Sequence, residues 1–267
     1  IDHGLQAGSA DAAAAAADAA RALGLEARVV RVEVDGGGGP EAAARDARYR
    51  ALAQAATQKA GVATLTGHTL DDQAETVLLG LARGSGSASL QGMAAVSDLA
   101  GVPLLRPLLG VRRAATRAAC AAQGLNPWDD PHNADPRYAR VRVRNSVLPT
   151  LEAELGPGIT EALARTAEQL REAADALAPM IDETIEDPAE PAEAGLSVSV
   201  AALAANPPAL RHRIIRHVVA AEFGESLSRM QTLEVARLVT DWSGQGPIDL
   251  PGCRARRAGR LIEFTAH

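Results

Sequence analysis

The sequence predicts an α/β protein: a doubly wound, mainly parallel sheet, then a helical connector and a small α+β C-terminal domain. In the first half, strand and helix patterns alternate, which is typical of a parallel sheet covered by helices. An acidic stretch rich in Pro and Ala follows a long amphipathic pattern, and the residues after it have their own strand and helix pattern. We therefore expect domains over residues 1–150 and 196–267, joined by a connector over 151–195.

The elements of the first half follow from local signals such as Gly24 after a helix and Pro40 at a helix start. The predicted order is helix 11–23, strand 27–34, glycine loop 36–39, helix 40–59, strand 62–66 and helix 70–83. Ile1–Gly4 resembles the exit of a strand. We therefore expect at least one further βα unit before Ile1.

The second half is predicted in the same way. Its elements are a strand at 102–106, a helix at 112–123, a polar loop at 127–136, a strand at 140–144, a helix at 159–185 and an acidic linker at 187–195. After the linker we expect a strand at 196–200, helices at 208–222 and 226–242, and a hairpin within 248–264. These last elements form the small α+β domain.

The composition excludes several classes of protein. With 47% hydrophobic and 22% charged residues, the chain is not disordered as a whole. Cys120 and Cys253 are too few for a disulfide framework or a cysteine-based zinc site, which favours a reducing, cytoplasmic location. The Ala-rich stretch after Ser9 carries Asp11 and Asp18, so it is too short an apolar run for a membrane span. Nothing at the start resembles a cleaved signal.

Charge is distributed unevenly around the net value of −6. Residues 102–150 carry 8 basic and 3 acidic side chains, residues 151–195 carry 2 and 12, and residues 250–267 carry 4 and 1. Two basic regions therefore flank an acidic connector. Such regions can bind a polyanion despite the negative net charge.

The most informative motif is Gly67–Thr76, which follows a predicted strand and opens a helix. That placement is the carboxyl edge of a parallel sheet, where such folds bind ligands. Asp72, Glu75 and Thr76 share one face of the helix by their spacing. Two interpretations stay open: a ligand site, or acidic residues that only complement the helix dipole.

The segment Arg140–Arg144 alternates Arg and Val, so as a strand it would present three guanidinium groups on one face. One interpretation is a solvated face. The other, which we favour, is contact with phosphates, because three arginines on one face repel each other unless anions meet them.

Several segments together carry a resemblance. They are DHGL (2–5), EAAARDARYRAL (41–52), GHTLDDQAETVLLGLARGSG (67–86), GM (92–93), RPLL (106–109) and NADPRYARVRVRNSVLPTLE (133–152). In this order and spacing the chain resembles the tRNA(Ile)-lysidine synthetases, members of the PP-loop ATP pyrophosphatases. The resemblance is close over about 1–155 and only general beyond.

The resemblance implies a tRNA-modifying ligase with an adenine nucleotide α-hydrolase-like fold. Such an enzyme adenylylates the wobble cytidine of an isoleucine tRNA with a CAU anticodon, using ATP and Mg²⁺, and then attaches free L-lysine. Residues 1–150 would be the PP-loop ATPase catalytic domain and 196–267 a tRNA-binding domain. A homodimer stays open, and no metal ligand is assigned.

The resemblance also implies roles for individual residues. Asp72 and Glu75 would be catalytic, binding the lysine ammonium and accepting its proton. The residues expected to bind ATP, Mg²⁺ or lysine are His68, Asp71, Thr76, Arg112 and Arg113. The residues expected to contact tRNA are Arg83, Arg137, Arg140, Arg142 and Arg144.

One departure from the family pattern concerns ATP. The signature Ser-Gly-Gly-x-Asp-Ser, which precedes the DHGL segment in the family, is absent from these 267 residues, so we expect the chain as given to be inactive. Two alternatives remain. One is another PP-loop tRNA-modifying activity such as thiolation, which the unpaired Cys120 and Cys253 disfavour. The other is a non-catalytic tRNA-binding protein, which the carboxylates at 71, 72 and 75 disfavour.

Overall fold

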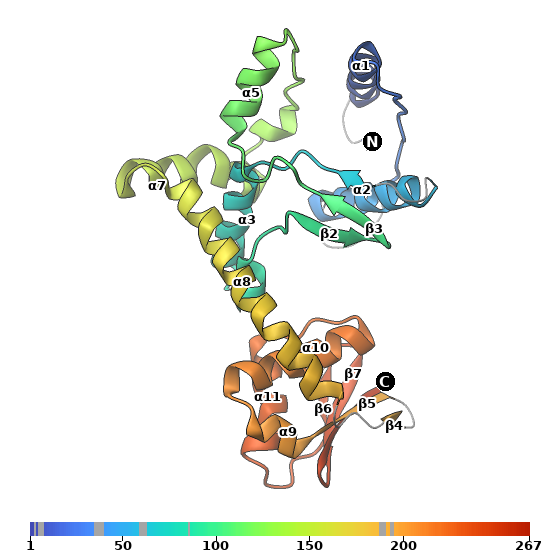
Figure 1. Ribbon diagram of the computed structural model, residues 1–267, viewed down its shortest axis with the longest axis vertical. Helices are drawn as coiled ribbons and strands as arrows, with labels where there is room; N and C mark the ends of the chain where they lie inside the picture. The colour runs from blue at the N-terminus through green and yellow to red at the C-terminus, as the bar shows by residue number, and fades with distance from the viewer. Residues whose placement is uncertain are drawn as a thin grey trace. The chain divides into compact units, whose positions relative to one another are not determined.

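The computed structural model describes all residues except 3, 5–7, 35–39, 59–62, 85, 187–190 and 193–194, and the side chains of 40–42, 185–186, 191–192 and 195 are also left out. The chain divides into two compact units. The first is Ile1–Ser85 with Ser89–Ala167, and the second is Gly86–Ala88 with Glu168–His267. The division falls within the long helix α8 (Ile159–Glu186), drawn in yellow in Figure 1.

The first unit contains a small sheet and the helices around it (Figure 1). The helices that precede β2 in the chain are α1 (Ser9–Ala22), α2 (Pro40–Thr57), α3 (Leu70–Ala82) and α4 (Gly86–Leu90), of which α4 is divided between the two units. The strands are β1 (Thr64–Leu65), β2 (Val96–Leu99) and β3 (Val102–Leu105). The elements that follow are α5 (Arg113–Ala122), the 3₁₀ helix η1 (Pro131–Ala134), α6 (Ala139–Arg142), the π-helix η2 (Val143–Val147) and α7 (Leu148–Leu155).

The described sheet has the order β1-β3-β2. Strands β1 and β3 are parallel, with Thr64 opposite Leu104, whereas β2 and β3 are antiparallel, with Val96 opposite Leu105. The antiparallel strand β2 was not predicted, because its exposed and half-buried residues (VSDL) give no apolar run. Parallel pairing also occurs at an isolated bridge between Asp2 and Arg31.

The predicted strand 27–34 is present only as this bridge. The Asp2 amide donates to the Val30 carbonyl at 2.8 Å, and the Val32 amide donates to the Asp2 carbonyl at 2.9 Å. The described residues of this segment form no ladder beyond this one bridge. The prediction of extended, parallel pairing here is therefore correct, but the predicted length is not. The glycine loop 36–39, His3 and Leu5 lie outside the described residues.

Helix α3 matches its prediction, and its start has a clear physical basis. Thr69 is extended and caps the helix: its backbone amide donates to Asp72 Oδ2 at 2.8 Å, and its side chain accepts from the Asp72 amide. This reciprocal capping box satisfies groups that a helix start leaves unpaired. The cap fixes the first turn of α3, where the acidic motif lies.

Gln73 attaches α3 to the loop that follows α4. Its side-chain amide donates to the Met93 carbonyl at 3.0 Å and accepts from the Met93 amide at 2.7 Å. Gly92 has a φ of +59°, and a Cβ there would lie 2.6 Å from Gln73 Oε1. Only glycine therefore fits at this position without displacing the amide.

The segment 139–155 is helical, so the predicted strand over 140–144 is wrong. Helix α6 continues through the π-helix η2 directly into α7. The alternation of Val and Arg covers only five residues. Val141 and Val143 are buried, and the helix to which they belong continues beyond Asn145 into α7. Tertiary packing here overrides the strand preference of valine. The helix places Arg140 and Arg144 on one face and Arg142 on another.

Two short helical turns were not predicted. One is α4, which begins at Gly86 shortly after α3. The polar loop 127–136 contains the 3₁₀ helix η1, which Asp130 caps by accepting from the His132 amide at 2.8 Å. Each difference is a single short helical turn, which sequence patterns resolve poorly because only a few residues define it.

Among the described residues, the second unit contains a five-stranded antiparallel sheet, three complete helices and the C-terminal part of α8. The sheet order is β4-β5-β8-β7-β6, and the strands are β4 (Pro191–Ala192), β5 (Gly195–Ser199), β6 (Ile248–Leu250), β7 (Cys253–Ala258) and β8 (Leu261–Ala266). The helices are α9 (Val200–Ala205), α10 (Pro208–Phe223) and α11 (Arg229–Thr240). The α+β prediction for this region is confirmed in its elements.

One core holds the second unit together. Ile214 and Val219 of α10, Val235 of α11 and Phe264 of β8 are fully buried in the same cluster. The buried Arg211 donates to the carbonyls of Leu203, Ala204 and Asn206 and so satisfies the end of α9. In either unit, no described helix is long and apolar enough to cross a membrane.

Candidate active site

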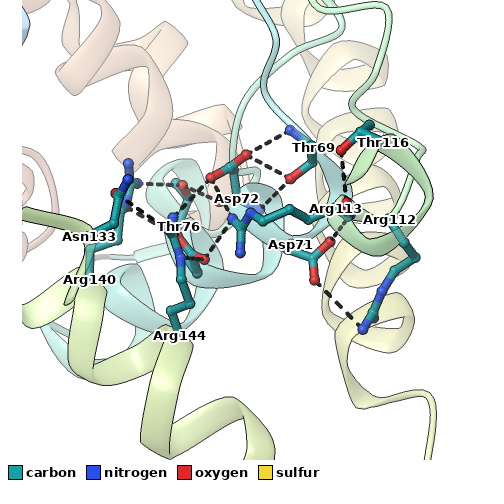
Figure 2. A network of polar contacts seen from close by, with 11 residues as sticks. Thr69, Asp71, Asp72, Thr76, Arg112, Arg113, Thr116, Asn133, Arg140 and Arg144 are labelled. Carbon is teal, nitrogen blue, oxygen red and sulfur yellow. Dashed lines mark hydrogen bonds and ion pairs between the residues drawn. The ribbon is translucent and has the colours of Figure 1, made fainter. Parts of the chain in front are cut away.

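Three carboxylates come from the first turns of α3, at the carboxyl end of β1. Asp71, Asp72 and Glu75 are the acidic residues of the predicted motif. Around them lie guanidinium groups from the start of α5 and from α6 and η2 (Figure 2). The site is therefore a network of opposite charges rather than an isolated acidic helix start.

Glu75 lies at the centre of this network and is fully buried, with 0% of its side chain exposed. Arg144 binds it with two groups, Nε to Oε1 at 2.8 Å and Nη2 to Oε2 at 3.0 Å. Arg113 Nη2 donates to Oε1 at 3.0 Å, and Arg140 Nε lies 3.7 Å from Oε2. A buried carboxylate requires such partners because leaving water is costly for an unpaired charge.

Asp72 divides its two oxygens between the helix cap and the arginines. Oδ2 accepts from the Thr69 amide and hydroxyl, at 2.8 and 2.7 Å, while Oδ1 accepts from Arg113 at 2.9 Å and from Arg144 at 3.4 Å. Burial acts to raise the pKa of Asp72, but the Thr69 hydrogen bonds and then Arg113 and Arg144 outweigh it and lower the pKa. Asp72 is thus held as an anion.

Asp71 orients the start of α5. Its Oδ2 accepts from the Arg113 backbone amide at 2.7 Å, and its Oδ1 lies 3.6 Å from Arg112 Nη2 (Figure 2). Arg112 also donates to Glu161 of α8 at 3.1 Å. Asp71 therefore connects α3 to α5, which explains why Arg113 reaches the other two carboxylates.

Arg140 and Arg144 enter the site because they are four residues apart on one helical face. Arg140 Nη2 donates to Thr76 Oγ1 at 2.9 Å, and that hydroxyl donates to the Asp72 carbonyl at 2.8 Å. The Arg140 Nε is buried and has no hydrogen-bond partner among the described residues. Burial acts to lower the pKa of Arg144, but Glu75, Asp72 and Asp71 outweigh it and raise the pKa. The π-helix that carries Arg144 is a form often found at functional sites.

A small cavity of about 300 Å³ opens beside the network. Its polar lining combines Asp71, Glu75 and Glu152 with Arg112, Arg113 and Arg144. Both signs of charge therefore line one compact space. Such a space suits a ligand that carries both an ammonium and a carboxylate.

A larger cavity of about 790 Å³ is lined by Arg140 and by Arg144, and Arg144 also lines the smaller cavity. Arg28, Arg45 and Arg48 add three more guanidinium groups. Sequence reasoning assigned no role to Arg45 or Arg48, although both belong to the segment EAAARDARYRAL. The resemblance marked this segment, but nothing in the sequence placed α2 beside Arg140 and Arg144.

His68 lies next to the network rather than within it. Its Nδ1 is 3.0 Å from Thr66 Oγ1. Burial lowers the pKa of His68 to about 4; Asp72 opposes this shift, and Arg48, Arg106 and Arg45 add to it. His68 is therefore neutral at physiological pH and is positioned as a hydrogen-bonding group, not as a cation.

Three of the predicted tRNA-contacting arginines lie apart from the carboxylates. Arg83 is the exposed residue after α3, eleven residues or about 16 Å along the helix from Asp72. Arg137 is exposed and pairs with Asp135 at 2.6 Å. Arg142 donates to the carbonyls of Pro136 and Arg137, at 2.7 and 2.9 Å. The structure thus brings together Arg140 and Arg144 with the carboxylates, but not these three.

Family models match both units. A PP-loop domain model matches residues 1–151, and a model of the TilS substrate binding domain matches residues 199–261. The first match confirms the predicted PP-loop, adenine nucleotide α-hydrolase-like fold.

Curated relatives match over nearly the whole chain. The tRNA(Ile)-lysidine synthase of Leifsonia xyli subsp. xyli is 60% identical over 269 residues, covering 100% of this chain and 80% of the relative. Those of Salinispora tropica and Streptomyces coelicolor are 53% and 51% identical, cover 98% of this chain, and are themselves covered over 79% and 75% of their length.

A solved structure has the same fold in its matching part. The U34-tRNA thiolase NcsA from Methanococcus maripaludis, with its 4Fe-4S cluster, matches with a TM-score of 0.51 at 20% identity. The match covers 61% of this chain and 57% of that chain. At this identity the likeness concerns the fold alone.

Proposed function

The chain belongs to the tRNA(Ile)-lysidine synthase family, and we propose that it activates the wobble cytidine of an isoleucine tRNA with ATP and joins it to lysine. The observation that carries the site assignment is the network formed by Asp72, Glu75, Arg113 and Arg144 at the start of α3. It lies within the PP-loop unit and beside two cavities of different size and charge.

We assign the nucleotide to the larger cavity. Arg28, Arg45, Arg48, Arg140 and Arg144 line it, and guanidinium groups bind phosphate through two parallel hydrogen bonds. Arg140 also pairs through Nε with Glu75 Oε2 at 3.7 Å, so it connects this cavity to the carboxylates. In the first step the cytosine carbonyl oxygen attacks the α-phosphorus of ATP, and pyrophosphate leaves. The arginines stabilise the charge that develops on the phosphate oxygens.

We assign lysine to the smaller cavity. Its α-carboxylate would pair with Arg112 or Arg113, which line the cavity. Its ε-ammonium would pair with Glu75, which also lines the cavity, and with Asp72, which lies next to the lining and shares Arg113 and Arg144 with Glu75. An ammonium that approaches Asp72 Oδ1 competes there with Arg113 and Arg144, so lysine binding loosens contacts that the free site makes. In the second step the deprotonated amine forms a bond to the activated cytosine carbon, and AMP leaves with the former carbonyl oxygen. Asp72 and Glu75 are the proposed acceptors of the ammonium proton.

Mg²⁺ is expected with ATP, but the described residues fit a bound ion poorly. They include no group of three or more His, Cys, Asp or Glu that could hold a metal ion. The site carboxylates Asp71, Asp72 and Glu75 each contact an arginine. No step of the proposed reaction is therefore assigned to Mg²⁺. A homodimer and a cytoplasmic location stay predictions.

We propose that the second unit contacts tRNA through one face of α10 and the start of α11. Burial, then Arg213 and Arg229, lower the pKa of Arg216. Burial also lowers the pKa of His212, and the nearby charge of Arg216 lowers it further. Among the described residues, no ion pair neutralises Arg213, Arg216 or Arg229. The repulsion between neighbouring cations that have no carboxylate partner is reduced when a phosphate binds between them.

A salt titration tests this assignment. The double change Arg213→Gln and Arg216→Gln is expected to weaken tRNA binding and to reduce the slope of log K against log salt by about one unit per lost contact. Arg254→Gln is the matched control, because Arg254 pairs with Asp249 at 2.7 Å in the same unit. Equal binding by both variants at every salt concentration would assign the contacts elsewhere.

Pyrophosphate exchange tests the first chemical step. The family's Ser-Gly-Gly-x-Asp-Ser signature is absent from the 267 residues, so we expect this chain alone to be inactive, and the assay uses protein with that segment restored before Ile1. Labelled pyrophosphate is expected to enter ATP only when tRNA with a CAU anticodon is present. An Arg48→Gln variant is expected to lose exchange, whereas Glu161→Gln, an exposed partner of Arg112, is expected to keep it. No exchange with any tRNA would refute the ligase assignment.

A further inference from the structure

Aromatic side chains are scarce in this protein, which makes their placement informative. The chain has two Trp, two Tyr and two Phe. Phe264 is fully buried in the second unit, as expected for a large apolar ring. Trp128 is instead 56% exposed, although its unit is packed largely with small aliphatic residues. A scarce, large ring left open to solvent indicates a role other than core packing.

Trp128 lines the larger cavity together with two other flat rings. His132 and Tyr138 line the same space, and their ring centroids are 5.7 Å apart at an angle of 58°. Arg140 and Arg144 line it as well. The segment 128–144 therefore brings flat rings and guanidinium groups to one cavity of about 790 Å³.

This combination matches the chemistry of an unpaired nucleotide. Proteins that bind single-stranded RNA stack its splayed bases on aromatic side chains and bind the backbone with arginines. A single exposed tryptophan would be unremarkable on a plain surface. Here it lines a concave space next to cations that bind phosphate, so base and backbone contacts are available together.

We propose that Trp128 is a stacking platform for a nucleobase, supplied by the anticodon loop of the bound RNA. The inference rests on the proposed function and deepens it, because it names the side chain that holds an unpaired base at the cavity. A base stacked there lies near Arg140 and Arg144, which connect the cavity to the Glu75 network. The same chemistry would accept the adenine of ATP, so the experiment separates the two sources.

Fluorescence can isolate this residue. The 267-residue chain contains only Trp128 and Trp242, so a Trp242→Phe variant reports on Trp128 alone. Anisotropy of a labelled RNA measures binding independently. A stem-loop RNA with a CAU loop is expected to bind and to quench Trp128. The same RNA with abasic loop nucleotides is expected to bind more weakly and not to quench. ATP alone, added to the same variant with the ATP signature restored, is expected to leave the fluorescence unchanged. Quenching by ATP and not by RNA would assign the platform to adenine and overturn the proposal.

Substitutions give a second readout. Trp128→Ala is expected to weaken stem-loop binding roughly 5- to 150-fold, the range found when an aromatic stacking partner is removed, and Trp128→Phe to restore most of it. Trp242→Ala is the matched control, because Trp242 lies in the second unit, 5.3 Å below the Arg257 guanidinium. Normal binding without quenching, or equal affinity for Trp128→Ala, would overturn the stacking role and leave the proposed function standing. Absence of RNA binding by the parent chain would overturn both.

Discussion

Replacing Glu75 by Gln tests whether the charge network holds the site together. The change keeps the size of the side chain but removes its charge and one acceptor oxygen. Glu75 is fully buried and accepts hydrogen bonds of 2.8 and 3.0 Å from Arg144 and 3.0 Å from Arg113. Removing one partner of a buried pair costs about 3–5 kcal/mol, because the remaining charges lose their partner without regaining water. We expect a loss of unfolding free energy within that range.

Urea denaturation measures this loss. In a Trp242→Phe background the fluorescence of Trp128 reports on the first unit. With a slope of about 2–3 kcal/mol per molar urea, a loss of 3–5 kcal/mol lowers the midpoint by roughly 1–2.5 M. The matched control is Glu161→Gln, whose ion pair with Arg112 is 39% exposed on each side and is therefore worth about 0–1 kcal/mol.

The reasoning would be refuted by equal effects of the two substitutions. It would also be refuted if Arg144→Gln removed the same free energy in the parent and in the Glu75→Gln variant. Two side chains in direct contact are expected to show a coupling energy in such a cycle. Independent losses would mean that the contact between Arg144 and Glu75 does not contribute to folding.

Three further predictions concern stability and pH. Gly92→Ala is expected to cost about 2–4 kcal/mol, because Cβ displaces the Gln73 amide and the positive φ is strained; Gly101→Ala has open space and is expected to cost only the strain of about 1–2 kcal/mol, as urea midpoints would register. His68 is expected to titrate near pH 4 when followed by NMR. Because the folded protein favours the neutral imidazole, the stability from His68 is present above pH 6.5 and is lost as the pH falls through 4. The variant His68→Gln is expected to lack this pH dependence. Thr160 and the amides of Gly158 and Ile159 lower the pKa of Glu152 to about 2, so its contribution is present above pH 4.5 and lost as pH falls through 2; Glu152→Gln is expected to flatten stability over that interval.

The sequence predicts the acidic part of the site well, because that part is local. The capped start of α3 places Asp71, Asp72 and Glu75 within two helical turns, and spacing alone indicates that they are close. The prediction that Arg140, Arg142 and Arg144 share one face was wrong. The segment is helical, with Val141 and Val143 buried, and a helix does not keep the alternation of a strand.

The remaining features depend on contacts between distant parts of the chain. Arg113 reaches Asp72 across 41 positions and Arg144 reaches Glu75 across 69, and no periodicity encodes such distances. The same holds for Gln73 and Met93, which are 20 positions apart. The sequence indicates Gly92 only through its resemblance segment, whereas the structure gives the physical reason. Pairing of charges across the fold is a tertiary property, so local patterns cannot specify it.

The most direct test of the account is lysine attachment itself. Protein with the ATP signature restored is incubated with ATP, labelled lysine and tRNA bearing a CAU anticodon, and the digested nucleosides are analysed by mass spectrometry. The account predicts label on one cytidine, with a mass increase of one lysine minus one water. It also predicts that Asp72→Asn lowers the rate roughly a hundredfold or more while tRNA binding persists. Bound tRNA without any lysine-modified cytidine, under conditions in which ATP is consumed, would contradict it.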